Sequence, residues 1–500
     1  MMSEVAAGAW QAVRCRVLVP TLQLAVYICV AMSLMLFVER LYMALVVAGL
    51  SLLRRRRRHD DDDLEANHRP MVLVQIPMFN EKQVYRLSIG AACGMTWPSD
   101  KLMIQVLDDS TDSTIREMVE VECSRWAGKG VSIRYENRRN RSGYKAGAMR
   151  EGLRKPYARD CEFVAIFDAD FQPDADFLLR TVPLLLADPA VALVQARWRF
   201  VNADECLLTR IQEMSLDYHF RVEQEVGSAC HSFFGFNGTA GVWRLRALED
   251  AGGWKERTTV EDMDLAVRAT LRGWRFVYAG HVAVRNELPS TLRAYRYQQP
   301  RWSCGPANLF RKMFREVLAS GRVSPWKKLH LLYGFFFVRK VVAHLVTFCF
   351  YCVVIPACVL AGGDVRLPKY VALYVPAAIT LLNAACTPRS WHLLIFWILF
   401  ENVMSMQRSK ATVIGLLEAS RANEWVVTEK LGAKTTTTAR KKTSGVHVHV
   451  AEILLGACLL YCAVYDIAYG RDSFYIYLLL QSAAAFIVGF GYVGTTSSPP

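Results

Sequence analysis

The chain has 500 residues, 53% of them hydrophobic, and a formal net charge of +14. Its length exceeds one ordinary domain, and its hydrophobic share exceeds that of an average soluble protein. The basic clusters, Arg54 to Arg58 and Arg440 to Lys442, lie beside apolar runs. Such clusters usually set membrane topology and contact lipid headgroups, so the charge argues against a nucleic-acid partner and for a lipid bilayer.

The apolar residues gather at the two ends of the chain. Residues 20–53 form one run, too long and without the cleavage site of a signal peptide, and 341–361, 369–387, 448–469 and 474–494 are also long enough to cross a bilayer. The mixed stretch 391–420 is typical of an interfacial or re-entrant helix. We therefore predict a membrane span and charged linker in 1–69, a soluble domain in 70–330 that ends in interfacial helices, and a multi-span region in 331–500.

Strand and helix patterns alternate through the soluble part. Apolar runs predict strands near 71–76, 103–107, 131–135, 163–167 and 191–195, and helices are expected at 82–94, after Thr111 or Asp112, and from Gly143. This alternation predicts an α/β fold, a mostly parallel sheet built from right-handed βαβ units.

Acidic residues follow two of these strands. Asp108 and Asp109 end the second, and Asp168 and Asp170 end the fourth. The carboxyl ends of parallel strands share one edge, where such folds bind ligands. A divalent cation would relieve the repulsion of two close carboxylates, which predicts a metal–diphosphate site. Solvated loop acids or helix N-caps are the alternative.

Further candidate residues lie at helix starts. Lys145, in a glycine-containing helix start, could contact a phosphate or be an ordinary surface lysine. The glycine- and phenylalanine-rich segment 231–244 suggests a loop that a ligand approaches, or buried packing. Asp262 is either a general base at a helix start or, with Thr259 as N-cap, half of a capping box.

A basic and aromatic segment follows. Gln298, Arg301 and Trp302 could bind a diphosphate and stack a sugar, or belong to a juxtamembrane helix.

In order, Asp109, Asp168-Ala169-Asp170, Glu261-Asp262 and Gln298-x-x-Arg301-Trp302 resemble the D, DxD, ED, QxxRW pattern of processive family-2 glycosyltransferases. Those are membrane enzymes that make cellulose, chitin, hyaluronan and related β-linked polymers. Longer strings at 74–81, 167–173, 234–241 and 301–312 resemble the plant cellulose synthase-like A subgroup, the glucomannan 4-β-mannosyltransferases. The resemblance covers nearly the whole chain.

The resemblance implies a GT-A (Rossmann-like) catalytic domain with α-helical transmembrane segments, and an inverting mechanism. The implied donor is GDP-mannose, with GDP-glucose as a second candidate, and the acceptor is a growing β-1,4-mannan. Asp108, Asp109, Glu81 and Lys145 would border the nucleotide pocket, and Asp168 and Asp170 would hold the diphosphate through Mg²⁺ or Mn²⁺.

The catalytic pair implied by the resemblance is Asp109 and Asp262, of which Asp262 would take the proton from the acceptor hydroxyl. Arg301 would add charge at the leaving group and Trp302 would stack the acceptor sugar. Gln298 and Glu261 are assigned to the acceptor and product side.

Two other functions stay open. A sister enzyme could make a β-1,4-glucan, such as a xyloglucan backbone, from UDP-glucose, because the motifs are the same. A membrane scaffold or transporter could keep an inactive transferase domain, although the complete acid set argues against it. The expected location is the Golgi membrane, with several spans, a cytosolic catalytic domain by the positive-inside tendency, and either homo- or hetero-oligomers.

Overall fold

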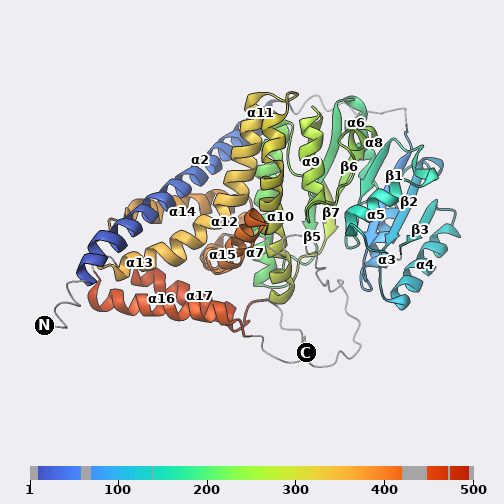
Figure 1. Cartoon of the computed structure of the whole chain (residues 1–500). Helices are drawn as coiled ribbons and strands as arrows, with labels where there is room; N and C mark the ends of the chain where they lie inside the picture. The colour runs from blue at the N-terminus through green and yellow to red at the C-terminus, as the bar shows by residue number, and fades with distance from the viewer. Residues whose placement is uncertain (1–9, 58–68, 139, 419–447, 471–472, 495–500) are drawn as a thin grey trace.

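A seven-stranded sheet at one end of the molecule is joined to a long helical assembly at the other (Figure 1). The computed structural model describes residues 10–57, 69–138, 140–418, 448–470 and 473–494. The sheet has the order β3-β2-β1-β4-β6-β5-β7. Its strands are β1 Val72–Met78, β2 Leu102–Asp108, β3 Ile133–Asn137, β4 Phe163–Ile166, β5 Val191–Phe200, β6 Gly241–Arg244 and β7 Arg275–Asn286.

The five predicted strands are all present, and the prediction of a mostly parallel sheet is confirmed. Only β6 runs antiparallel, between β4 and β5, and the other pairs are parallel. Neither β6 nor β7 is among the predicted strands. The first is only four residues long, and the second alternates buried with exposed residues along part of its length rather than forming one apolar run.

Helices cover both faces of the sheet, as in a Rossmann-like domain. One face of β1 packs against α3 Tyr85–Cys93, α4 Ser113–Ala127 and α6 Phe177–Ala187. The opposite face packs against α5 Tyr144–Leu153, α8 Leu245–Asp250, α9 Glu261–Leu271 and α10 Leu292–Ala319. The predicted N-cap of α4 is Asp112, whose carboxylate accepts hydrogen bonds from the amides of Thr114 and Ile115.

Among the described residues, three helical segments are long and apolar enough to cross a membrane, namely Trp10–Leu53, Pro325–Leu360 and Val450–Tyr469. The first includes most of α2 Val19–Arg57. The second joins α11 Pro325–Leu329, α12 Ala343–Val346 and α13 Ile355–Leu360 through π-helical turns, and the third is α16 Val450–Tyr469. The predicted spans at 369–387 and 474–494 are helices, α14 Lys369–Ala384 and α17 Tyr475–Gly489, but both are shorter than those three.

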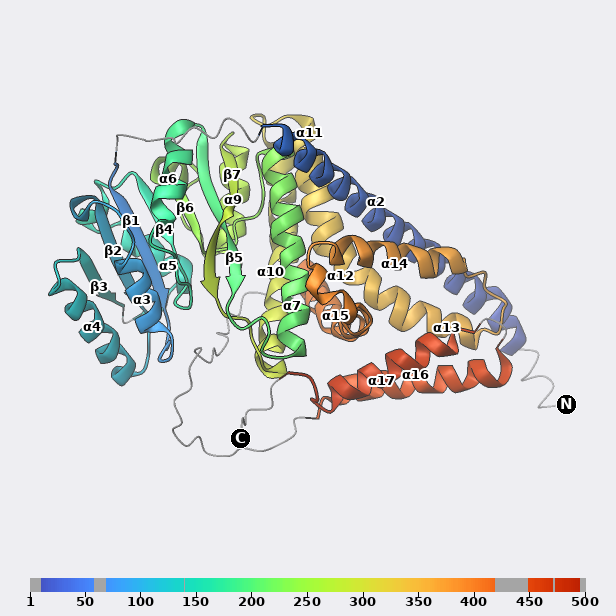
Figure 2. The same cartoon turned by 180° about the vertical axis from the view of Figure 1, so that it is seen from behind.

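The mixed stretch 391–420 contains α15 Leu394–Leu417, a continuous helix that packs against α10, α12 and α17. It has buried polar partners, such as Asn402, whose amide donates to Gln481 Oε1 at 3.0 Å. Figures 1 and 2 show α10 standing between the sheet and the helical assembly. This helix therefore carries residues of the soluble part directly onto the membrane-type helices.

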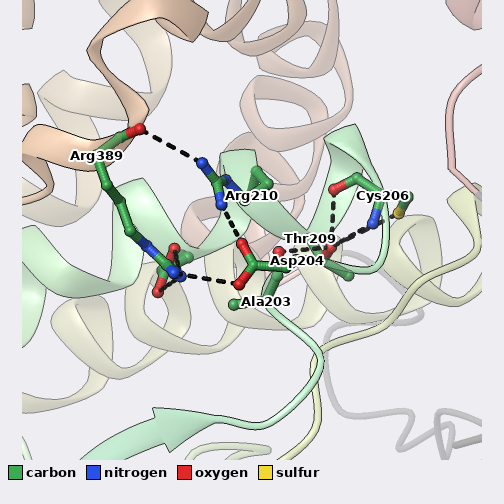
Figure 3. A network of polar contacts seen from close by, with 7 residues as sticks. Ala203, Asp204, Cys206, Thr209, Arg210 and Arg389 are labelled. Carbon is green, nitrogen blue, oxygen red and sulfur yellow. Dashed lines mark hydrogen bonds and ion pairs between the residues drawn. The ribbon is translucent and has the colours of Figure 1, made fainter.

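Charged side chains fasten the two parts together. In α2, Glu39 accepts from Arg339 at 3.0 Å and Arg40 donates to Glu223 at 2.7 Å, so the charges that interrupt the first apolar run are both paired. At the start of α7 Leu207–Tyr218, Arg210 pairs with Asp204, which also accepts from Arg389 at 3.2 Å (Figure 3). The linker 58–68 and the loop 419–447 lie outside the described residues. They contain all of the two basic clusters except Arg54–Arg57.

Candidate active site

A cavity that is partly open to solvent lies at the carboxyl edge of β1 and β4 and reaches α10. The lining includes all the predicted site residues except Asp108. They are Glu81, Asp109, Lys145, Asp168, Asp170, Glu261, Asp262, Gln298, Arg301 and Trp302. The predicted convergence of these side chains is thus present in the fold.

The DxD segment follows β4 directly. Asp168 is 35% exposed, whereas Asp170 is buried. Lys145 Nζ donates to Asp168 Oδ1 at 2.5 Å and to the carbonyl of Gly238 at 2.8 Å. Burial opposes the charge on Lys145, but Asp168 and Glu261 outweigh it and raise its pKa. The lysine is therefore a firmly held cation in the middle of an acidic site.

The start of α5 depends on a glycine. Gly143, the N-cap residue, has φ +69°, and a Cβ there would lie 2.1 Å from the Glu256 side chain. Glycine removes both the conformational penalty and the clash. Lys145 therefore projects from the first turn of the helix toward the DxD segment.

Asp109 is clamped by an arginine that the sequence analysis did not single out. Arg138 donates from Nε to Asp109 Oδ1 at 2.7 Å and from Nη2 to Oδ2, and both side chains are nearly buried. Burial raises the pKa of Asp109, and the hydrogen bonds from Arg138 oppose that rise. Arg138 and Asp109 thus hold each other in place at the edge of the cavity.

The neighbouring Asp108 does not border the cavity, which corrects the predicted position of this residue. It is fully buried, with Oδ1 accepting from the Ser110 amide and Oδ2 from the Tyr135 hydroxyl, both at 2.9 Å. As the last residue of a parallel strand it points away from the edge where Asp109 emerges, because successive side chains alternate. Its contacts shape the turn after β2.

Glu261 and Asp262 open α9. The N-cap is Val260 without any side-chain cap, so the capping-box interpretation with Thr259 is wrong. Instead, Asp262 Oδ1 accepts from the Met263 amide at 2.7 Å. Burial raises the pKa of Asp262, and Lys145 opposes that rise. Burial and the charge of Asp262 raise the pKa of Glu261 to about 7.

The residues of the QxxRW segment lie within α10, three and four positions apart, on the face that borders the cavity. This helix approaches the loop before α9 closely, since a Cβ at Gly305 would lie 2.5 Å from Val260 Cγ1. Burial lowers the pKa of Arg301, and Glu261, Asp168 and Asp262 counteract it. The helix therefore borders the cavity and also packs against membrane-type helices.

Comparisons with known proteins identify the family. Residues 73–240 match the model for glycosyl transferase family 2, and 163–385 match that for glycosyl transferase family group 2. Glucomannan 4-beta-mannosyltransferase 1 of Cyamopsis tetragonoloba is 61% identical, over 97% of this chain and 95% of that protein. Glucomannan 4-beta-mannosyltransferase 9 of Arabidopsis thaliana is also 61% identical, over 97% and 93%. The chain belongs to the glucomannan 4-beta-mannosyltransferases.

Among solved structures, this transferase is similar to a mannosyltransferase from Pyrobaculum calidifontis, in complex with GDP-Man and Mn²⁺. The TM-score is 0.48 and the identity 21%, over 78% of this chain and all of that one.

The DxD segment of this transferase fits a hard divalent cation. Its two carboxylates, separated by one residue, both line the cavity, and oxygen ligands are those that Mg²⁺ and Mn²⁺ prefer. Within the described residues no group of three or more His, Cys, Asp or Glu side chains is arranged to hold a metal alone. Asp168 and Asp170 would therefore need donor phosphate oxygens to complete the coordination, as is common for Mg²⁺.

Several cavity residues of this transferase are absent from the sequence-based set. Arg141 stacks its guanidinium 3.5 Å from the centre of the Phe79 ring, and Asn237 lies in the glycine-rich loop before β6. The cluster of arginines at 138–141, directly after the third predicted strand, is the sequence signal that could have indicated the arginines. Asn237 falls within the segment 231–244, for which either a loop that a ligand approaches or buried packing was expected.

Proposed function

We propose that this transferase moves a mannosyl group from GDP-mannose, with GDP-glucose as a second donor, to the C4 hydroxyl of a β-1,4-linked mannan or glucomannan chain, with inversion. One contact supports this most directly. Lys145 bridges Asp168 and the Gly238 carbonyl, and a Cβ at Gly238 would lie 2.7 Å from Asp262 Oδ2. The diphosphate residues and the proposed base therefore face each other across one glycine.

This arrangement assigns a role to each group. Asp262 takes the proton of the acceptor hydroxyl as its oxygen attacks the anomeric carbon, and the bond from that carbon to the GDP oxygen breaks. A positioned base typically contributes ~10²–10⁴-fold. Lys145 and Arg301 offset the charge that grows on the diphosphate. A divalent cation bound by Asp168 and Asp170 would supply further charge stabilisation there.

The donor is tested by incorporation. Membranes expressing the full chain are incubated with labelled GDP-mannose or UDP-glucose, and the product is digested with a β-mannanase. We expect mannanase-sensitive polymer from GDP-mannose. Incorporation from UDP-glucose alone would favour the β-1,4-glucan synthase, and incorporation from neither donor would favour a scaffold or transporter.

We also propose a multi-pass protein of the Golgi membrane that acts in plant cell-wall synthesis. The three helices of sufficient length and their exposed apolar side chains support a bilayer environment. Protease protection on sealed vesicles tests the sidedness. Digestion of the soluble domain from outside is expected for a cytosolic active site, whereas protection would place it in the lumen.

A further inference from the structure

The segment 237–240, directly before β6, has an unusual backbone. Gly238 has φ +78°, and Ala240, which carries a Cβ, has φ +54°. A residue other than glycine in this region costs conformational energy and persists only where surrounding contacts hold it, and such residues cluster at functional sites. The contacts that hold this segment therefore indicate what it does.

The register of the sheet places Thr239 beside the DxD segment. Strand β6 runs antiparallel to β4, with Gly241 opposite Ile166. When this register is continued past the ends of both strands, Thr239 falls opposite Asp168. The two residues are in contact there, since the Asp168 amide donates to Thr239 Oγ1 at 2.9 Å. The threonine hydroxyl thus holds the main chain of the DxD segment at its first carboxylate residue.

Gln195 of β5 holds the segment from its other side. Gln195 Nε2 donates to the carbonyls of Thr239 at 2.9 Å and Ala240 at 3.0 Å. Its Oε1 accepts from the Asn237 amide at 3.4 Å. Both Gln195 and Thr239 are fully buried. The segment is therefore fixed between β4 and β5, with the Thr239 hydroxyl directed toward Asp168.

The carboxylate of Asp168 is held through the same segment. Lys145 Nζ donates to Asp168 Oδ1 at 2.5 Å and to the Gly238 carbonyl at 2.8 Å. Thr239 thus fixes the main chain of Asp168, and Gly238 fixes its side chain through the lysine. A Cβ at Gly238 would lie 2.7 Å from Asp262 Oδ2, so the segment also contacts the proposed base. Two consecutive residues therefore set the place of the DxD segment relative to the lysine and the base.

Thr239 acts on the site only through Asp168. It is fully buried and is not among the residues that line the cavity. A valine in its place would have nearly the same shape but no hydrogen-bond acceptor, so the Asp168 amide would lose its partner. The direction of the first DxD carboxylate would then be less firmly fixed.

We propose that Thr239 is a positioning residue, which holds Asp168 in the orientation that serves the divalent cation and the donor diphosphate. The inference rests on the proposed transferase function, and adds to it a residue that touches neither substrate nor cation. It also gives a reason for the left-handed backbone at Ala240, which brings the threonine hydroxyl next to the DxD segment.

The test measures GDP binding to the full chain in nanodiscs by calorimetry, once with Mn²⁺ and once with EDTA. The affinity in EDTA reports on the pocket without the cation, and the ratio of the two affinities reports on the cation that Asp168 would bind. For Thr239→Val we expect this ratio to fall about three- to tenfold, and the affinity in EDTA to change by less than about twofold. Thr239→Ser keeps the acceptor and should restore the wild-type ratio.

Thr181→Val is the matched control. Thr181 is also fully buried, its hydroxyl donates to the Phe177 carbonyl at 2.8 Å within α6, and it lies outside the cavity lining. Its replacement should leave the ratio unchanged, because it removes a buried threonine hydroxyl away from Asp168. Thr239→Ala, which removes the acceptor without a branched side chain, carries the same expectation if the valine variant does not fold.

An unchanged ratio in Thr239→Val would overturn the proposal. So would an equal loss of GDP affinity in EDTA and in Mn²⁺, since this would mark a general effect on the pocket. A wild-type GDP affinity that Mn²⁺ does not increase would also overturn it, because Asp168 would then hold no cation. Failure of the proposed function is distinct from these results, as wild-type protein would bind GDP with Mn²⁺ but transfer no mannose.

Discussion

At the residue scale, Lys145 ties the charges of the cavity together. It contacts Asp168 and the Gly238 carbonyl, and its charge opposes the rise in the pKa values of Asp262 and Glu261 that burial causes. The charge of this lysine thus acts both on the DxD segment and on the proposed base. The lysine contacts the DxD segment, and its charge favours the ionised form of the proposed base.

Asp262→Asn tests the base. The amide keeps the shape but cannot accept a proton, so we expect the transfer rate to fall by ~10²–10⁴-fold while GDP affinity stays near that of wild type. Rates with labelled GDP-mannose and equilibrium GDP binding measure both. The control is Asp160→Asn at an exposed position. Near-normal transfer by the variant would exclude Asp262 as the base.

Lys145→Met tests the electrostatics through the pH dependence of the rate. The base must be deprotonated, so the rate falls as the pH drops through its raised pKa. Removing the ammonium removes a contribution that lowers this pKa, so the acidic limb should move to higher pH. Rates at saturating donor, from pH 5 to 9, measure it. Lys155→Met, a lysine paired with Glu136 outside the cavity lining, is the control, and a limb that moves to lower pH would contradict the prediction.

At the element scale, the loop between α7 and β6 brings backbone close to the catalytic groups. Gly238 has φ +78°, and no larger residue fits between Asp262 and Lys145. The first turn of α9 and the long helix α10 meet at Gly305. Two glycines therefore set how closely the base, the lysine and the QxxRW helix can approach.

Gly238→Ala should separate geometry from stability. The Cβ would lie 2.7 Å from Asp262 Oδ2 and 3.3 Å from Lys145 Nζ, so the two charged groups must move apart and transfer should be largely lost. Gly253→Ala is the matched control, with φ +66° and open space around its Cβ. Both should lose about 1–2 kcal/mol from the left-handed backbone. Equal transfer rates in the two variants, measured beside thermal unfolding, would contradict this account.

Elements were predictable to different degrees. Buried parallel strands have continuous apolar runs in the sequence, so β1 and β4 could be predicted. The antiparallel β6 has only four residues and takes its place from its neighbours rather than from its own pattern. The predicted N-cap of α9 was Thr259, because threonine is a common capping residue. In the structure the N-cap is Val260, and the helix begins at Glu261.

At the scale of the whole molecule, nearly buried ion pairs join α2 to the rest. Glu39 and Arg339 connect α2 to the segment Pro325–Leu360, with side chains only 12% and 6% exposed. Arg40 connects the same helix to Glu223 beside the cavity. The first membrane-type helix is thus part of the support of the active site as well as an anchor.

Arg339→Met should strongly destabilise the full chain. It leaves Glu39 nearly buried without its partner, at a cost of about 3–5 kcal/mol. The double variant Glu39→Gln with Arg339→Met should regain much of that loss, because no charge is left uncompensated. Asp364→Asn breaks the exposed pair with Arg14 and should cost at most about 1 kcal/mol. Thermal unfolding in detergent ranks them, and a double variant less stable than Arg339→Met would contradict the reasoning.

The α/β class, five of the strands, the apolar segments and the motif residues could be predicted from the sequence, because burial and membrane length leave local periodic patterns. The clamp of Arg138 on Asp109, the position of Asp108 outside the cavity, and the contact of His219 with Asn237 became visible only in the folded chain. These depend on contacts between residues 18 or more positions apart or on the direction of a side chain at a strand end. Neither leaves a pattern along the chain, since they arise only when the strands and helices pack.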